Sequence, residues 1–273
     1  MKSVRTAATT LNLPTLRLEG GLFMPDMLQK AAQGQARLQA EADYAIPKGL
    51  KLKDEFSRAF QIASAQWRAF APLLERADFD AQQASASFIT ELLRDALGYP
   101  AVGASTGITL GDRHYPITHL ASPAAALQGA GAQALPIVVA PHTLGLDDAD
   151  PRFAVQGSGS RRKSAFQLAQ ELLNASPEHQ WALVTNGKTL RLLRDAATLT
   201  RPSYLEVDLQ DLLGTQRFTE FGCAWRLLHA SRAGLLPACC RAPQPTRRPW
   251  CGKPGARPDR RKASRSAKAC AKA

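Results

Sequence analysis

The 273-residue chain has 45% hydrophobic and 21% charged residues, a composition typical of soluble proteins. Its first residues do not resemble a signal peptide, and it has no apolar run of roughly 18 residues that could span a membrane, so we expect a cytoplasmic protein. Its net charge of +12 comes almost wholly from residues 235–273, which hold 11 of the 35 Lys and Arg but only one of the 23 acidic residues, Asp259. The remaining 24 basic and 22 acidic residues nearly balance, so the charge does not indicate that the preceding part binds nucleic acid.

The first quarter of the chain predicts helices of unequal strength. We expect residues 1–50 to be an N-terminal extension, partly flexible, with a short Gln- and Ala-rich helix at 25–42. Apolar residues at spacings of three and four over 52–76 predict a longer amphipathic helix that packs one face on a core. Pro72 is expected to kink or end this helix, because proline lacks an N–H group and clashes with the preceding turn.

A further helix is predicted over 81–97. Either Asp78 or Asp80 can cap its start, since a carboxylate there accepts hydrogen bonds from the first free N–H groups of a helix. Gly98 provides the stop, because glycine readily adopts the left-handed conformation that ends helices.

After this helix the pattern changes from helical to extended. Residues 108–110 and 114–120 are predicted to be short strands around a turn at 111–113, followed by an Ala- and Gly-rich loop at 121–133. The apolar run at 135–140 has no polar alternation, which is typical of a strand covered on both faces.

A β-α-β unit begins with this run. The helix predicted at 163–174 and the apolar strand at 181–185 should complete the unit, with its two strands parallel. Asn186 and Gly187 predict a type I′ turn into a hairpin strand at 189–194. The last two predicted elements are a strand at 204–209 and a helix at 218–232.

The order from residue 81, which is helix, three strands, helix and strand, resembles the core of the restriction-endonuclease-like fold. The segment TELLRDALGY at 90–99 is similar to the first core helix of nuclease domains in type I restriction subunits and type IIG restriction enzymes. QLAQELL at 167–173 is similar to their second core helix. WALVTNGKTLRLLR at 181–194 is the most specific stretch and resembles the strand and hairpin that end that core.

The resemblance extends over about residues 45–234. Residues 195–208 and 221–232 are similar to the continuation of large proteins in which this domain is fused to an adenine-specific DNA methyltransferase. The resemblance therefore implies the N-terminal, nuclease-like α/β domain of a type IIG-like restriction-modification or phage-defence protein. It implies DNA, the methyltransferase domain and other defence-system subunits as partners, and no membrane.

The resemblance also indicates where a nuclease site would lie. Nucleases of this fold need an acid before the central strand and then Glu-x-Lys or Asp-x-Lys on it, because two carboxylates hold Mg²⁺ and the lysine helps to activate water. By this resemblance Val139 stands in the position of the family's Glu and Pro141 in that of its Lys. Asp112 could supply the first acid, but one carboxylate does not make a metal site.

Other acidic and basic residues remain as weaker candidates. Asp147 and Asp148, with Asp150 nearby, are either relocated catalytic acids or members of a solvated loop. A short basic run and a glutamine at the second core helix can contact DNA phosphates, since helix N-termini favour anions, or can form a solvated basic surface. These DNA-binding candidates are Arg161, Arg162, Lys163 and Gln170.

The chain contains no complete site for other chemistry. It has no Asn-Pro-Pro-Tyr or Asp-Pro-Pro-Tyr methyltransferase motif, no dinucleotide-binding glycine pattern and no P-loop. We therefore expect no cofactor for this fragment. Mg²⁺ would apply only to an active nuclease, and S-adenosylmethionine only to the missing methyltransferase domain.

The segment 235–273 differs from everything before it. It has no Ile, Val, Phe, Tyr, Met or Glu and six Pro, so we expect a disordered tail after a nuclease-like domain at 51–234. Its four cysteines lack the paired spacing of zinc ligands. It could be a basic nucleic-acid-binding arm, but its composition favours a frameshift after about Gly234 in a GC-rich gene, which would leave a truncated protein.

Three functional hypotheses follow from these observations. The first is a DNA-associated, nuclease-like domain that is catalytically inactive as it stands. The second is a scaffold that binds a partner protein and no DNA. The third is a Mg²⁺-dependent endonuclease that uses Asp112, Asp147 and Asp148 as relocated acids.

Overall fold

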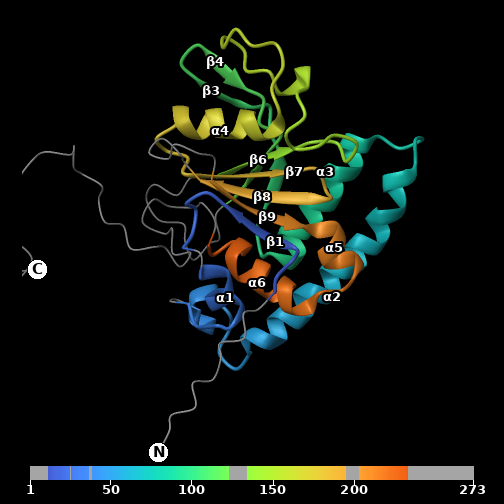
Figure 1. The fold of residues 1–273 in the computed structure, drawn as a ribbon, viewed down its shortest axis with the longest axis vertical. Helices are drawn as coiled ribbons and strands as arrows, with labels where there is room; N and C mark the ends of the chain where they lie inside the picture. Colours follow the sequence, from blue (N-terminus) through green and yellow to red (C-terminus); the bar gives the residue numbers. More distant parts are fainter. Residues whose placement is uncertain (1–11, 25, 37–38, 123–133, 195–202, 233–273) are drawn as a thin grey trace, which may run out of the picture. The chain divides into compact units, whose positions relative to one another are not determined.

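The apolar runs at 135–139 and 181–185 form the middle of an open, mixed sheet of seven strands, and helices cover both of its faces (Figure 1). The computed structural model describes residues 12–24, 26–36, 39–122, 134–194 and 203–232. The strand order is β1-β9-β8-β7-β6-β5-β2. The strands are β1 (Leu16–Glu19), β2 (Val102–Ala104), β5 (His119–Ala121), β6 (Leu135–Val139), β7 (Trp181–Thr185), β8 (Thr189–Arg194) and β9 (Tyr204–Asp208).

The predicted β-α-β unit is present. Strands β6 and β7 are parallel, with Ile137 opposite Leu183, and all other neighbouring strands in the sheet are antiparallel. Helix α4 (Ala165–Ala175) connects them, and Ser164 caps it by accepting a hydrogen bond from the N–H of Gln167. All five residues of β6 are buried, as its uninterrupted apolar sequence predicts.

The side chains of the sheet alternate between two cores. On β8, Leu190 and Leu192 face a large helical core, while Arg191 and Leu193 face the side of α4. The helical core contains α2 (Leu52–Phe70), α3 (Ala81–Glu91) and α6 (Phe218–Leu228), together with the short α1 (Met27–Ala32) and α5 (Leu209–Gly214). The other core lies under α4 and the small hairpin β3 (Ile108–Leu110) and β4 (Arg113–Tyr115) (Figure 1).

Several predicted helices are shorter than expected. The helix predicted at 25–42 is limited to α1, and a 3-10 turn (Glu41–Tyr44) follows it. The helix predicted at 52–76 ends at Phe70, and Pro72 lies in the 3-10 turn that follows, which confirms its effect. Asp80 caps α3 as predicted, the segment Leu92–Ala96 is a π-helical turn, and Gly98 has a φ of +74°. None of the described helices is long and apolar enough to cross a membrane.

The single strand predicted at 114–120 is wrong. It is divided into β4, which forms a separate two-stranded sheet with β3, and β5, which pairs with β2 and β6. Pro116 lies between the two strands, and because it has no N–H group it interrupts a continuous ladder of hydrogen bonds. Strands β1 and β2 and helix α5 were not predicted. The tail at 235–273 and the expected frameshift at Gly234 lie outside the described residues, as does most of the loop expected at 121–133.

Candidate functional site

Uncharged side chains form hydrogen bonds with the backbone at the end of β6. Val139 is 1% exposed, and its carbonyl accepts a 2.8 Å hydrogen bond from Nε2 of Gln82 on α3. The hydroxyl of Thr118, just before β5, accepts from the N–H of Val139 at 2.8 Å and donates to the carbonyl of Ile137 at 3.0 Å. These neighbours of Val139 are an amide and a hydroxyl, so they do not supply the negative charge that a carboxylate brings to a metal ion.

A cleft of about 550 Å³ opens beside this strand end. Its lining includes Gln82, Thr118, Val139, Asp150 and Arg152. Asp150 is the only carboxylate among the lining residues described, and it accepts hydrogen bonds at 2.9 Å from both the backbone N–H and the Nε of Arg152. The backbone bond, and then the charge and hydrogen bond of the Arg152 side chain, lower the pKa of Asp150 despite the opposing effect of burial.

Asp112 does not lie on the sheet. It is exposed in the turn between β3 and β4, and these strands pair with each other and not with β5 or β6. Within the part of the chain that the structure describes, no three His, Cys, Asp or Glu side chains are grouped so that they could hold a metal ion.

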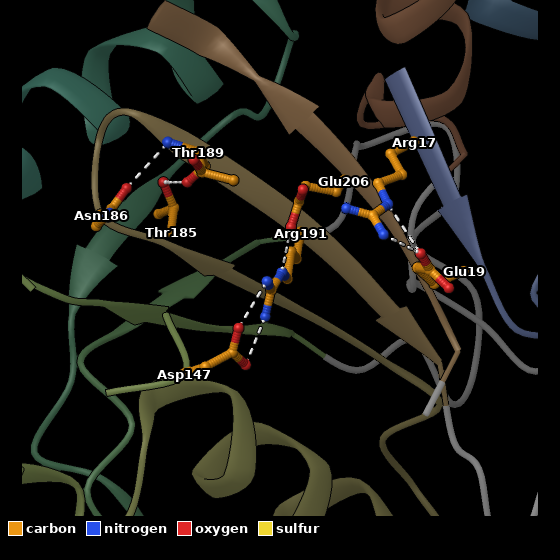
Figure 2. Close-up of polar contacts among 8 residues, drawn as sticks. All are labelled: Arg17, Glu19, Asp147, Thr185, Asn186, Thr189, Arg191 and Glu206. Atoms are coloured by element: carbon orange, nitrogen blue, oxygen red, sulfur yellow. Dashed lines mark hydrogen bonds and ion pairs between the residues drawn. The ribbon is translucent and has the colours of Figure 1, made fainter. Parts of the chain in front are cut away.

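Asp147 and Asp148 both stabilise the loop that follows β6. Asp148 accepts a hydrogen bond from the N–H of Gly145 at 2.7 Å. Asp147 receives two hydrogen bonds of 2.8 Å from the guanidinium of Arg191, and Glu206 on β9 accepts the Nε of the same arginine at 2.7 Å (Figure 2). Such a forked pair gives a fixed geometry, so it attaches the loop to the middle of β8.

Arg191 is charged although it is only 8% exposed. Burial disfavours its charged form, but the hydrogen bonds and charges of Asp147 and Glu206 outweigh burial and raise its pKa. The rings of Tyr204 and Phe166 lie 4.6 Å and 5.3 Å from its guanidinium carbon and add cation–π contacts. No local pattern in the chain indicates this cluster, because Asp147 and Arg191 are 44 positions apart.

The turn at Asn186 and Gly187 is present, but its predicted type I′ conformation is wrong. That type needs a positive φ at both residues, and only Gly187, at +84°, has one. The side chain of Asn186 supports the turn in another way, since its Oδ1 accepts the N–H group of Lys188 at 3.1 Å and that of Thr189 at 2.9 Å. Figure 2 shows the contact with Thr189.

This turn is fixed to the elements around it. The Nδ2 of Asn186 donates to the carbonyl of Leu144 at 2.8 Å, and Ser85 of α3 donates its hydroxyl to the carbonyl of Asn186 at 3.1 Å. A Cβ atom at Gly187 would lie 2.7 Å from Cζ of Phe70 on α2. The most specific motif of the sequence therefore has a structural role, which is to dock the β7–β8 hairpin against α2 and α3.

The segment 150–163 is closed and anchored. Its ends meet in an antiparallel bridge, in which the N–H of Asp150 donates to the carbonyl of Lys163 at 2.9 Å. Its middle pairs with the β3–β4 hairpin through a bridge between His114 and Gln156. A short 3-10 turn (Pro151–Phe153) begins it, and Phe153 is buried beneath. The loop is thus a fixed platform next to the cleft.

The predicted basic residues have different surroundings. Arg161 and Arg162 are exposed, and Nη2 of Arg162 donates to the carbonyl of Ala149 at 2.8 Å. The side chain of Lys163 is only 16% exposed and forms an ion pair with Glu171. Lys163 therefore belongs to the anchoring of the loop, whereas Arg161 and Arg162 present their charges to solvent.

Gln170 contributes little to this surface. It lies half-buried on α4, where its Nε2 donates to Asn174 at 3.4 Å. The first turn of α4 is also occupied, because Ser164 and Gln167 form a capping box. The expectation that the free N–H groups of this helix start face a phosphate is weakened by this cap.

Two further arginines, which were not predicted, join the basic loop. Arg152 and Arg113 have side chains that are 46% and 47% exposed. A Cβ atom at Gly157 of the loop would lie 3.5 Å from Cγ of Arg113, so the hairpin arginine adjoins the loop. Together Arg113, Arg152, Arg161 and Arg162 form the arginine surface. In the sequence, only the clustering of three of these arginines within twelve positions indicated the arginine surface.

Searches against protein-family models, curated proteins and solved structures found no match.

Proposed function

We propose that this chain is a DNA-associated domain with a restriction-endonuclease-like core, from a restriction-modification or phage-defence protein, which holds DNA without cutting it. The sequence resemblance motivates the family and the DNA partner. The element order along the chain, from α3 through β2, β5 and β6 to α4 and β7, is compatible with that core. In such a parent protein the methyltransferase domain would supply the chemistry.

One observation supports the proposal: beside the end of β6 lies a basic surface, and Asp150 is the only carboxylate among the cleft-lining residues that the structure describes. Val139 is enclosed by the Gln82 amide and the Thr118 hydroxyl, while four arginines lie on the anchored loop and hairpin beside the cleft. Arginine forks bind phosphate oxygens through two parallel hydrogen bonds. A fixed loop also loses little conformational entropy when it binds.

The experiment compares two double variants of the full chain. Arg161→Ala with Arg162→Ala removes two charges from the arginine surface, whereas Arg17→Ala with Arg94→Ala removes two charges from exposed, acid-paired sites elsewhere. The affinity for a fluorescent DNA duplex is measured by anisotropy at several salt concentrations. Both proteins keep the basic tail, so its contribution cancels in the comparison.

The loop variant should weaken binding and reduce the salt slope of the logarithm of affinity by up to about 1.8, which is about 0.9 for each lost phosphate contact. The control variant should retain the wild-type slope. Equal losses in the two variants would mean that only net charge matters and that the loop makes no specific phosphate contact.

A further inference from the structure

A second surface lies on the other side of α3, where α2 and α3 form a groove of about 470 Å³. Gln82 lines the cleft at the end of β6, whereas its neighbour Gln83 lines this groove. Helix α3 thus separates two differently built surfaces.

The floor of the α2–α3 groove is aromatic. Phe70 and Phe88 are each 3% exposed and stack in parallel, with ring centroids 4.5 Å apart. Phe79 forms an open wall and is 43% exposed. The rings give an apolar partner side chain a place to bury surface.

The rim of the groove is acidic. Asp78, Asp80 and Glu91 contribute three carboxylates, and no Lys or Arg is found among the groove-lining residues that the structure describes. Arg76 lies next to this lining, with its guanidinium carbon 4.2 Å from the centre of the Phe79 ring and an ion pair to Asp78. This contact shows the chemistry that the site accepts, which is a cation over the aromatic wall beside a carboxylate.

We propose that the α2–α3 groove is a docking site for a cationic amphipathic segment of a partner protein, with an aromatic or leucine anchor on the stacked rings and Lys or Arg at the acidic rim. Charge complementarity favours a basic occupant, because Arg76 balances only Asp78, and the remaining carboxylates, Asp80 at the start of α3 and Glu91 at its end, leave the rim negative. A buried apolar anchor with charges around it is the usual arrangement when a helix binds in a groove. This docking does not depend on DNA binding by the arginine surface.

The test uses two synthetic helical peptides with the same Leu and Trp face. One peptide has Lys on its polar face and the other has Gln, and each is titrated with the full-length chain by fluorescence anisotropy. The Lys peptide should bind about tenfold more tightly than the Gln peptide. The double variant Phe79→Ser with Glu91→Lys should weaken binding of the Lys peptide by at least about tenfold.

A matched double variant, Leu50→Ser with Glu178→Lys, changes one exposed apolar and one exposed acidic residue outside the groove and should bind as the wild type does. Thermal unfolding checks that the variants fold. If the double variant does not fold, the single variant Glu91→Lys is used in its place. Amide hydrogen exchange should show peptide-dependent protection in α2 and α3. Equal affinity for both peptides, or unchanged affinity in the groove variants, would overturn the proposal.

Discussion

The two faces of the central sheet each enclose a basic side chain, and the two side chains differ in charge: Arg191 is charged, whereas His229 is neutral. On the α4 face, Arg191 remains charged because Asp147 and Glu206 hold its guanidinium. On the helical face, His229 lies against Tyr44 and Trp225, with ring centroids 5.7 Å and 4.3 Å away.

The surroundings of His229 favour its neutral form. Burial, followed by the positive charges of Arg232 and Arg58, lowers the pKa of His229 to about 3. Its Nδ1 makes a 2.9 Å hydrogen bond with the hydroxyl of Ser231, which needs no charge on the ring. Two properties separate these side chains: arginine has a much higher ordinary pKa than histidine, and Arg191 has two carboxylate partners, whereas His229 experiences the positive charges of Arg232 and Arg58.

The two faces of the sheet also differ in the parts of the molecule that they support. The helical face is an apolar support built from aromatic residues of α2, α3 and α6. The α4 face contains the charged cluster and supports the anchored arginine loop. Substitutions on the two faces should therefore have different signatures.

The largest effect is expected for Arg191→Ala. Removal of the guanidinium leaves Glu206 partly buried without its partner and releases the loop after β6, so the free energy of unfolding should fall by about 3 kcal/mol. Asp147→Ala should cost less than about 1 kcal/mol, because the Asp147 side chain is 66% exposed and water can replace it. Urea unfolding measures both values. Equal losses of unfolding free energy in the two variants would show that the ion pair with Asp147, and not the burial of Arg191 and Glu206, determines the stability of the cluster.

A smaller difference is expected between two glycines with similar backbone angles. Gly187 and Gly159 have φ values of +84° and +75°, so alanine is strained at both positions. A Cβ atom at Gly187 would also collide with Phe70, whereas nothing lies within 4 Å of one at Gly159. We expect losses of about 2 kcal/mol and about 1 kcal/mol, respectively.

Thermal or urea unfolding checks this ranking of the two glycine variants. Because Phe70 also lies on the floor of the α2–α3 groove, Gly187→Ala should alter peptide binding there as well, while Gly159→Ala should not. A larger loss at Gly159 would mean that the basic loop is more tightly packed than its surroundings indicate.

The smallest effect near neutral pH is expected for His229. Its folded-state pKa is lowered, so below about pH 6.5 the unfolded chain binds a proton that the folded chain does not. The stability that this histidine contributes is complete above pH 6.5 and declines toward pH 3, by at most about 1.4 kcal/mol per pH unit. The variant His229→Gln should show a shallower loss between pH 6.5 and pH 4 in urea unfolding. If stability depends on pH in the variant as it does in the wild type, other titrating groups cause the loss of stability.

The sequence predicted the elements whose signals are local. The uninterrupted apolar run of β6, the helical spacing of α4 and the apolar run of β7 were sufficient to predict a parallel pair. The three-residue strands β2 and β5 were missed or merged, since so short a strand has no period of its own and is formed by its neighbours. Strand β1 depends in the same way on its pairing with β9.

For the candidate site, the sequence allowed only one kind of prediction, namely which catalytic residues are replaced. Val139 and Pro141 could be identified by resemblance, and that assignment stays a prediction. The anchoring of the loop 150–163, the contribution of Arg113 and the use of Asp147 as a partner of Arg191 all depend on contacts between distant segments. No spacing along the chain encodes them.

The central claim, that the domain holds DNA but does not cut it, is tested most directly by one assay. Supercoiled plasmid is incubated with the full chain and Mg²⁺, and one gel is read for both retardation and cleavage. We expect retarded plasmid that remains supercoiled after the protein is removed. Nicked or linear plasmid that disappears with Asp112→Ala would contradict it.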